Sequence, residues 1–276
     1  MAAVLFALGA AALWGTGDFF GGLAARRTSV LIVLFWSQLV GLAGLVVWIA
    51  LTDAAGPGTR LLFAAVAGVC GVVGLGCLYR GMAIGAMGIV APISALSPAV
   101  PLVVDLARGR SPSPVQWAGI AFALAGIVLL SREPGKARGP AAAGVGLALV
   151  AALAFGLFIV GIGEAARESA PWAAGTARLS SVTALIIVLA GTRTAPRISS
   201  RLLPIVVLVG AFDAGANALL VLAATHGAIG IVAVLSALYP IVTILLARAV
   251  LHERLGTTRT VGGLIALSGA AMIATG

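Results

Sequence analysis

The sequence predicts an all-α membrane protein of ten transmembrane helices, arranged as an inverted-topology 5+5 repeat. Three observations predict this fold. The 276 residues are 61% hydrophobic and only 9% charged, the apolar runs are long enough to cross a bilayer, and one segment of the chain occurs twice. A soluble domain is about a quarter charged, so a chain with a mean hydropathy of +1.18 is expected to reside in lipid.

Ten apolar runs reach the about 17 to 25 residues that a helix needs to cross the hydrocarbon core. Charged residues, prolines and glycines separate them. The predicted spans are Ala2–Ala24, Val30–Leu51, Leu61–Tyr79, Met87–Ala107, Val115–Ser131, Ala141–Gly163, Trp172–Gly191, Leu202–Thr225, Ile229–Val250 and Thr260–Gly276. The polar stretch SREPGKARGP divides them. We therefore expect a first five-helix repeat over 1–131, a charged linker over 132–140 and a second five-helix repeat over 141–276.

The duplication is clearest around two prolines. GAMGIVAPISALSPAVPLVVD from Gly85 and GAIGIVAVLSALYPIVTILLA from Gly227 share 11 of 21 positions at an offset of 240 − 98 = 142 residues. ALWGTGDFFGGLAAR matches LAFGLFIVGIGEAAR at an offset of 141, which pairs Arg26 with Arg167. Because five spans are an odd number, the second copy enters the membrane from the opposite side. Inverted repeats of this kind recur in secondary transporters.

Composition also limits the partners. The net charge is +9 and the pI about 11.4, but the basic residues are scattered between apolar runs, so we expect a lipid bilayer and no nucleic acid as partner. Cys70 and Cys77 lie about 10 Å apart on one helix, too far for a disulfide. We expect no metal and no cofactor, apart from a coupling proton or cation. A GxxxxGK[ST] loop, which an ATP-driven pump needs, is absent from the sequence.

Two prolines fall inside predicted spans, at equivalent positions of the two copies. Pro98 and Pro240 each remove a backbone hydrogen bond and free the carbonyl four residues earlier, that of Ser94 or of Ser236. In lipid, a free carbonyl must face protein, water or ligand. Either each proline makes an ordinary kink whose free carbonyl is hydrogen-bonded by a neighbouring helix, or spans four and nine break at mid-membrane and line a central cavity. In the second case Pro98 and Pro240 are hinge or gating residues.

Ionisable groups within the spans are the second functional signal, because such groups are costly in lipid and usually face a cavity. Asp18 lies well inside the first span, one turn after Trp14, and Asp213 and Asn217 are four residues apart in the eighth. Arg178 in the seventh span is an ion-pair candidate for Asp213 or Asp18. For each residue a structural ion pair remains an alternative to a functional role.

Aromatic side chains with a polar atom complete the candidate site. Tyr79 closes the third span and Tyr239 directly precedes Pro240; both suit a flat or cationic ligand, although an interfacial aromatic belt explains Tyr79 equally well. The predicted substrate-binding residues are Trp14, Asp18, Tyr79, Ser94, Ser97, Asp213, Asn217, Ser236 and Tyr239, with no catalytic residue among them.

Three motifs carry a resemblance to a known family. These are Leu13-Trp14-Gly15 in the first span, Ser-Ala-Leu-x-Pro in spans four and nine, and a loop that ends in Gly119 or Gly262 before a small-residue helix. With them, each half resembles an EamA domain of the drug/metabolite transporter superfamily. The family often has a Glu before the last span of each copy. Glu253 fits this pattern, whereas the first copy has Arg110 or Ser111.

The resemblance implies a secondary transporter that exports or exchanges a small metabolite or drug, such as an amino acid or amine, by alternating access. It places the cavity between spans one, three, four, six, eight and nine. We expect a multi-pass protein of the bacterial plasma (inner) membrane, as a monomer or homodimer. Twelve of the 17 Lys and Arg residues lie at odd-numbered loops and four at even ones, which predicts both termini outside.

Two alternatives belong to other functional classes. GTGD at Gly15–Asp18 matches the GxGD motif of intramembrane aspartyl proteases, with Asp213 as the second aspartate. However, the order of the motifs is reversed and the companion Pro-Ala-Leu is missing, so we expect no enzyme. The other alternative is a non-transporting membrane scaffold or receptor.

Overall fold

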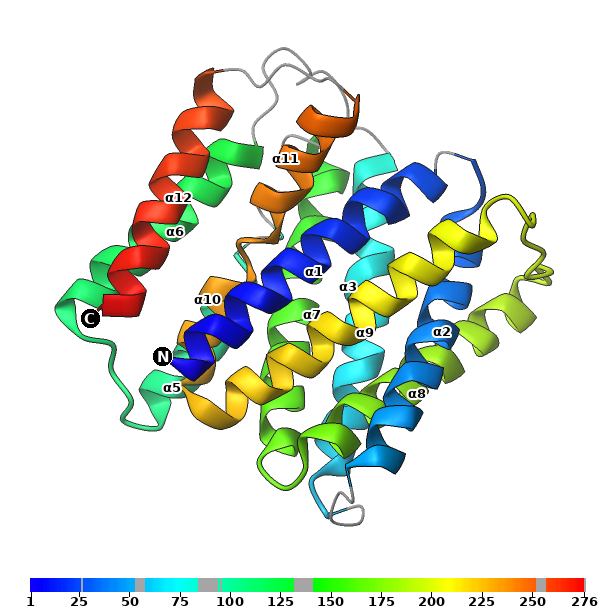
Figure 1. Ribbon diagram of the computed structural model, residues 1–276, viewed down its shortest axis with the longest axis horizontal. Coiled ribbons are helices and arrows are strands. Elements are labelled where there is room, and N and C mark those ends of the chain that lie inside the picture. Colours follow the sequence, from blue (N-terminus) through cyan, green and yellow to red (C-terminus); the bar gives the residue numbers. More distant parts are fainter. Residues whose placement is uncertain are drawn as a thin grey trace.

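The computed structural model describes residues 1–25, 27–52, 58–83, 94, 96–131, 141–251 and 257–275, and this part of the chain is helical (Figure 1). The helices are α1 (Ala2–Ala25), α2 (Val30–Leu51), α3 (Leu61–Ala83), α5 (Ala99–Ala107), α6 (Pro114–Ser131), α7 (Ala141–Ala166), α8 (Ala170–Gly191), α9 (Leu203–His226), α10 (Ile229–Ser236), α11 (Tyr239–Leu251) and α12 (Thr257–Thr275). Six of the described helices are long and apolar enough to cross a membrane, and α6 and α12 contain shorter apolar stretches.

The predicted spans agree with these helices to within a few residues. The second span is α2 as predicted, and the ninth divides into α10 and α11. The second half of the fourth span is α5, and residues 87–93 and 95 of this span lie outside the described part. The sixth span continues as α7 to Ala166, three residues beyond its predicted end at Gly163. Glu164 lies in these extra residues, and its carboxylate pairs with Arg60 and Arg108, which stabilises the last turn of α7.

The helix of the ninth span is interrupted just before Pro240. Ser236 ends α10, Ala237 and Leu238 form a turn, and Tyr239 begins α11. In the first copy, residues 96–98 form a turn and α5 begins directly after Pro98. The two copies therefore interrupt their helices at the positions that the sequence pairs. The role of the prolines as hinges stays a prediction.

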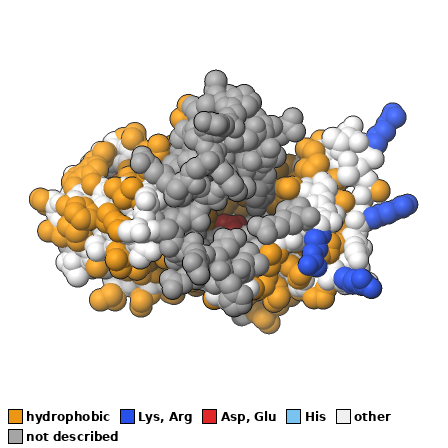
Figure 2. Space-filling view, turned by 90° about the horizontal axis from the view of Figure 1, so that it is seen from above, with side chains coloured by type: hydrophobic (Ala, Val, Ile, Leu, Met, Phe, Trp, Pro, Cys, Tyr) orange, Lys and Arg blue, Asp and Glu red, His pale blue; other side chains and the backbone are white. Residues whose placement is uncertain are grey.

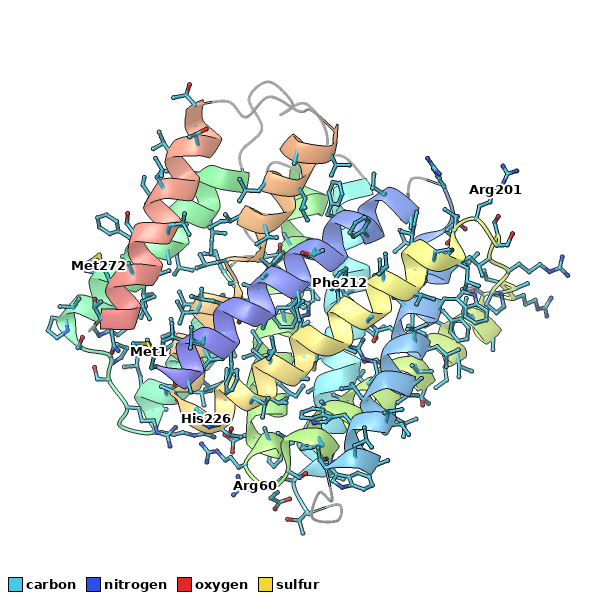
Figure 3. All side chains as sticks on the ribbon, viewed as in Figure 1. Met1, Arg60, Arg201, Phe212, His226 and Met272 are labelled. Carbon is cyan, nitrogen blue, oxygen red and sulfur yellow. The ribbon has the colours of Figure 1, made fainter. Side chains whose placement is uncertain are left out.

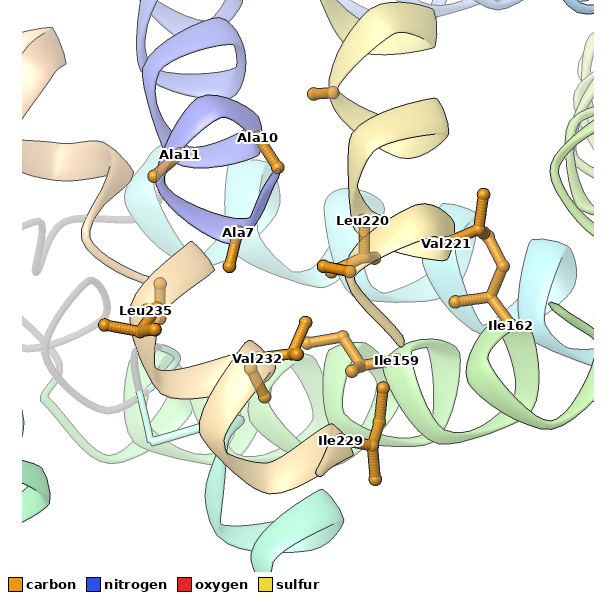
Figure 4. Close-up of a cluster of buried hydrophobic side chains, with 14 of the residues drawn as sticks. Ala7, Ala10, Ala11, Ile159, Ile162, Leu220, Val221, Ile229, Val232 and Leu235 are labelled. Atoms are coloured by element: carbon orange, nitrogen blue, oxygen red, sulfur yellow. The ribbon is translucent and has the colours of Figure 1, made fainter. Parts of the chain in front are cut away.

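Both chain termini lie at one end of the bundle, at the lower left of Figure 1. This end, called the terminal end below, comprises the start of α1 and of α10 and the end of α5, α7 and α12. An apolar core fills the bundle on this side (Figure 4). It is formed by side chains at most 7% exposed: Ala7, Ala10, Ala11, Ile159, Ile162, Leu220, Val221, Ile229, Val232 and Leu235. All of these side chains are therefore shielded from water.

Glycines bring α6 and α12 into backbone contact at the periphery of the bundle. A Cβ atom added to Gly126 would lie 2.4 Å from the backbone nitrogen of Ala266, and one added to Gly269 would lie 2.4 Å from that of Ala123. Small residues allow membrane helices to approach this closely, and van der Waals packing then holds them together.

Gly126→Ala should separate α6 from α12 and lower the free energy of unfolding by about 1–3 kcal/mol, the usual cost of overpacking. Thermal unfolding in detergent measures the change. Gly44→Ala is the matched control, because a Cβ atom at Gly44 meets nothing within 4 Å. Equal melting temperatures for the two variants would contradict the predicted backbone contact.

Candidate functional site

Asp213 on α9 is the centre of a polar network between four helices. Its Oδ1 accepts hydrogen bonds from the indole Nε1 of Trp14 (3.1 Å) and from Nδ2 of Asn217 (3.2 Å). Its Oδ2 accepts one from Nε2 of Gln38 (3.2 Å) and forms an ion pair with Arg178. Arg178 also donates to the amide oxygen of Gln38. Both carboxylate oxygens of Asp213 are thereby occupied.

Burial explains why this network is complete. The side chain of Arg178 is 6% exposed and that of Asp213 is 24% exposed, while Gln38 and Asn217 are buried. An uncompensated charge at this depth would cost several kcal/mol, so one guanidinium opposite one carboxylate, with the remaining donors and acceptors paired, is the arrangement that lipid tolerates. The network carries no net charge.

The structure brings four of the predicted residues together here, namely Trp14, Arg178, Asp213 and Asn217. Arg178 pairs with Asp213, one of its two predicted partners. Sequence reasoning missed Gln38, although a single amide inside the apolar second span was a usable signal.

Asp18 lies one turn beyond Trp14 on α1 but does not join this network. It makes no hydrogen bond or ion pair with any residue that the structure describes, and it is exposed although it lies deep within α1. It is within electrostatic range of Asp213 and Tyr239. Figure 2 looks down on the upper side of the bundle in Figure 1 and shows an acidic side chain near the middle of that face. The exposed carboxylate of Asp18 has no counter-charge among the described residues.

The other predicted residues lie around the two helix breaks. Ser94, Ser97 and Ser236 are buried, and the hydroxyl of Ser236 donates to the carbonyl of Ala233 (3.1 Å). Tyr239 is partly buried at the start of α11 and packs against the apolar core. The side chains of Tyr79 and Pro240 fall outside the described part of the structure.

A second charged cluster closes the terminal end. Glu164, in the last turn of α7, contacts Nη1 of Arg60 at 3.1 Å, Nη1 of Arg108 at 2.5 Å and Nη2 of Arg167 at 3.4 Å. The side chain of Glu164 is only 11% exposed. Figure 3 places Arg60 at this end, below His226.

Two more acidic residues extend this cluster. Glu168 accepts hydrogen bonds from the backbone N–H of Arg60 (2.9 Å) and the hydroxyl of Thr59 (3.1 Å). Asp105, in the last turn of α5, accepts one from the backbone N–H of Gly230 (2.6 Å). Asp105 and Glu164 lie near the ends of apolar runs in the sequence, where a charged residue normally sits in the membrane interface. Both are instead buried, and each has at least one partner in the other repeat.

A shallow pocket of about 440 Å³ lies beside this cluster. Its lining comes from the α5–α6 connection, the turn after α7, the end of α9 and the turn before α10: Arg110, Arg167, Ala224, Thr225, Gly227 and Ala228. It opens at the terminal end and does not include any predicted site residue.

The family comparison matches both halves of this architecture. The EamA-like transporter family matches residues 1–132 and again residues 142–275. The chain belongs to the EamA-like transporter family. It is therefore a multi-pass membrane protein of a transporter family, with the bilayer and a small-molecule substrate as its partners.

Solved structures share the fold of this EamA-like transporter. One structure, named "Crystal structure of protein", superposes with a TM-score of 0.81 over 99% of this chain and 96% of the other, at 19% sequence identity. At that identity the likeness concerns the fold alone. No curated protein matches the sequence.

Arg178→Gln should lower the free energy of unfolding by about 3 kcal/mol, because removal of one partner leaves the carboxylate of Asp213 uncompensated. The double variant Arg178→Gln, Asp213→Asn should recover part of that loss, since two neutral amides can pair with each other. Thermal unfolding in detergent of the single and double variants measures the coupling. A double variant less stable than the single one would contradict the ion pair.

Proposed function

We propose that this protein is a secondary transporter that moves a small metabolite or drug across the bacterial plasma membrane by alternating access, with Asp18 as its proton or cation site. The observation that carries the proposal is the contrast between two aspartates. Asp213 has all its oxygens occupied, whereas Asp18 is exposed inside the bundle with no described partner. A carboxylate in such a position is costly unless water, a proton or a cation reaches it.

The closed terminal end supports the transport cycle. The apolar core of Figure 4 and the pairs around Glu164 seal one end of the bundle, while Asp18 is accessible. A site reached from one side is what alternating access requires of each of its two states. The inverted repeat supplies the other state, because the two halves can exchange conformations.

Direction follows from the same arrangement combined with the charge rule. If the odd-numbered loops are cytoplasmic, as their Lys and Arg content predicts, the terminal end faces outward and the accessible side faces the cytoplasm. Substrate then loads from inside, which favours an exporter or exchanger. The acidic and basic groups within the spans fit an amino acid, an amine or a related compound. The transporter acts as a monomer or homodimer.

The two alternative functions fit the geometry less well. An aspartyl protease needs two aspartates that share one proton. Both oxygens of Asp213 are held by donors from Trp14, Gln38, Arg178 and Asn217, so Asp213 has no free oxygen to share with Asp18. A scaffold or receptor would show no substrate-dependent protection of the cavity residues from chemical labelling.

Asp18→Asn should abolish transport, because the neutral amide can neither carry a proton nor attract a cation. The measurement compares metabolites inside and outside cells that express wild type, Asp18→Asn, Asp18→Glu or an empty vector. A compound enriched outside with wild type, absent with Asp18→Asn and partly restored with Asp18→Glu is the expected result. Equal export by wild type and Asp18→Asn would remove Asp18 from the mechanism.

Pro98→Ala and Pro240→Ala should each slow the transport of that compound, because alanine restores a backbone donor and straightens a broken helix. Hinge substitutions often change kcat and KM together. Pro171→Ala is the control, since Pro171 occupies the start of α8, where proline is compatible with a helix. Normal rates for both Pro98→Ala and Pro240→Ala would exclude the hinges.

A further inference from the structure

We propose that Asp105 is a one-sided latch that favours the state closed at the terminal end; this rests on the proposed alternating access. The latch joins the two proline-interrupted spans. The carboxylate belongs to α5 in the first repeat, and its partner is the first turn of α10 in the second repeat.

The hydrogen bond from Gly230 is the short contact of the Asp105 carboxylate, whose other oxygen, Oδ1, lies 3.8 Å from Nη1 of the exposed Arg110. Asp105 lies in the last turn of α5 and is 2% exposed, and a carboxylate at a helix C-terminus is repelled by the helix dipole. The first turn of α10 reverses that effect. Its N-cap residue is Ala228, which has no side-chain acceptor, so Oδ2 of Asp105 accepts the hydrogen bond of the Gly230 N–H that a Ser or Asp cap would otherwise accept.

The two helices cross here at backbone distance. A Cβ atom at Gly230 would lie 2.7 Å from Cδ2 of Leu102, 3.0 Å from its Cα and 3.0 Å from Oδ2 of Asp105. Only glycine therefore allows the crossing as it stands. Arg108 fixes the same end of α5 to Glu164 of α7 at 2.5 Å. The crossing of α5 and α10 lies at the terminal end, where α10 also packs against α1 and α7.

The duplicated sequence repeats the glycine of this crossing but not its carboxylate. At the offset of 142, Gly230 corresponds to Gly88, whereas Asp105 corresponds to Ala247. In a state closed at the opposite end, the position equivalent to Asp105 would therefore carry no carboxylate.

The acidic residues of the ion pairs around the crossing also have no acidic counterpart at the equivalent positions of the first repeat. At the offset of 141, Glu164 corresponds to Leu23 and Glu168 to Arg27. The Arg-Leu-Leu of Arg60 recurs at Arg201, which Figure 3 shows at the other end of the bundle. Where the terminal end pairs Arg60 with Glu164 and Glu168, the equivalent positions offer an apolar residue and a second arginine.

The two states of the cycle are therefore unequal in energy although the folds of the two halves are alike. The unloaded protein should populate the state closed at the terminal end, and a ligand must bind the other state more tightly to open it. Loss of the Asp105 contact removes a helix cap, which should shift the ratio of open to closed molecules on the order of fivefold.

The test measures distances across the terminal end by double electron–electron resonance on the full-length protein in lipid nanodiscs. Spin labels are attached to Ser111→Cys, in the α5–α6 connection, and to Thr225→Cys, in the last turn of α9; both positions are exposed. Cys70 and Cys77 are replaced by alanine. Wild type should show mainly the short distance.

Four substitutions separate the possible outcomes. Asp105→Ala should raise the long-distance fraction about fivefold, and Asp105→Asn should raise it less, because its amide oxygen still accepts the Gly230 hydrogen bond. Ala247→Asp, which places a carboxylate at the sequence position equivalent to Asp105, should also raise it. Val103→Ala, on the exposed side of α5, should leave it unchanged.

The results distinguish the latch from the transport cycle. A long distance that is present in wild type but unchanged by Asp105→Ala and Ala247→Asp overturns the latch and leaves alternating access standing. One short distance in every variant overturns both. If Asp105→Ala does not fold, Asp105→Asn, which has nearly the same shape, and Ala247→Asp decide the question.

Discussion

A carboxylate inside a bilayer needs a counter-charge or a donor, and that constraint organises the described part of this chain. Asp213 is neutralised by Arg178 and held by three further donors. Asp105 is held by the first turn of a helix from the other repeat. Asp18 has neither among the described residues, and its side chain is exposed. The first two aspartates thus join helices to one another, whereas the third makes no such contact with a described residue.

The same constraint acts on the backbone. A helix satisfies its own donors and acceptors in lipid, and every described span uses that solution except near Pro98 and Pro240. There the helices are interrupted, and the free groups must meet protein or water. Both interruptions lie next to buried serines, Ser97 and Ser236. Some of the predicted substrate-binding residues thus lie where the helices break, and the others lie on the continuous helices α1, α3 and α9.

The interruptions also explain how two short helices can seal the terminal end. The short helices α5 and α10 meet at Gly230, where a Cβ atom would lie 3.0 Å from Cα of Leu102, so that their backbones approach closely. The apolar core behind the crossing contributes buried surface, but hydrophobic contacts alone do not select which residues pair. Polar contacts of Asp105, Arg108 and Glu164 define which residues meet.

The sequence was sufficient for the helices and for part of the site. Spans such as α2 could be predicted to the residue because lipid requires a fixed length of apolar chain. The i, i+4 spacing of Asp213 and Asn217 and the position of Arg178 identified a polar pair. Which aspartate pairs with Arg178, Asp18 or Asp213, depends on the packing of α8 against α9. The residue pattern along a single helix carries no information on that packing.

The terminal cluster was beyond sequence reasoning for a different reason. Asp105 and Glu164 lie at helix ends, and at a helix end a charged residue normally faces water. Whether it does depends on what the adjacent chain segments offer. Here the turn before α3 and the first turn of α10 cover both carboxylates, and neither contact has any local sequence signature.

Duplication gives a chain two equivalent halves, and the acidic residues are where these halves have diverged. Asp18 itself illustrates this, because its counterpart at the offset of 141 is Ile159, which is 6% exposed within the apolar core of Figure 4. The first repeat therefore contributes the accessible carboxylate, and the second contributes packing at the same place.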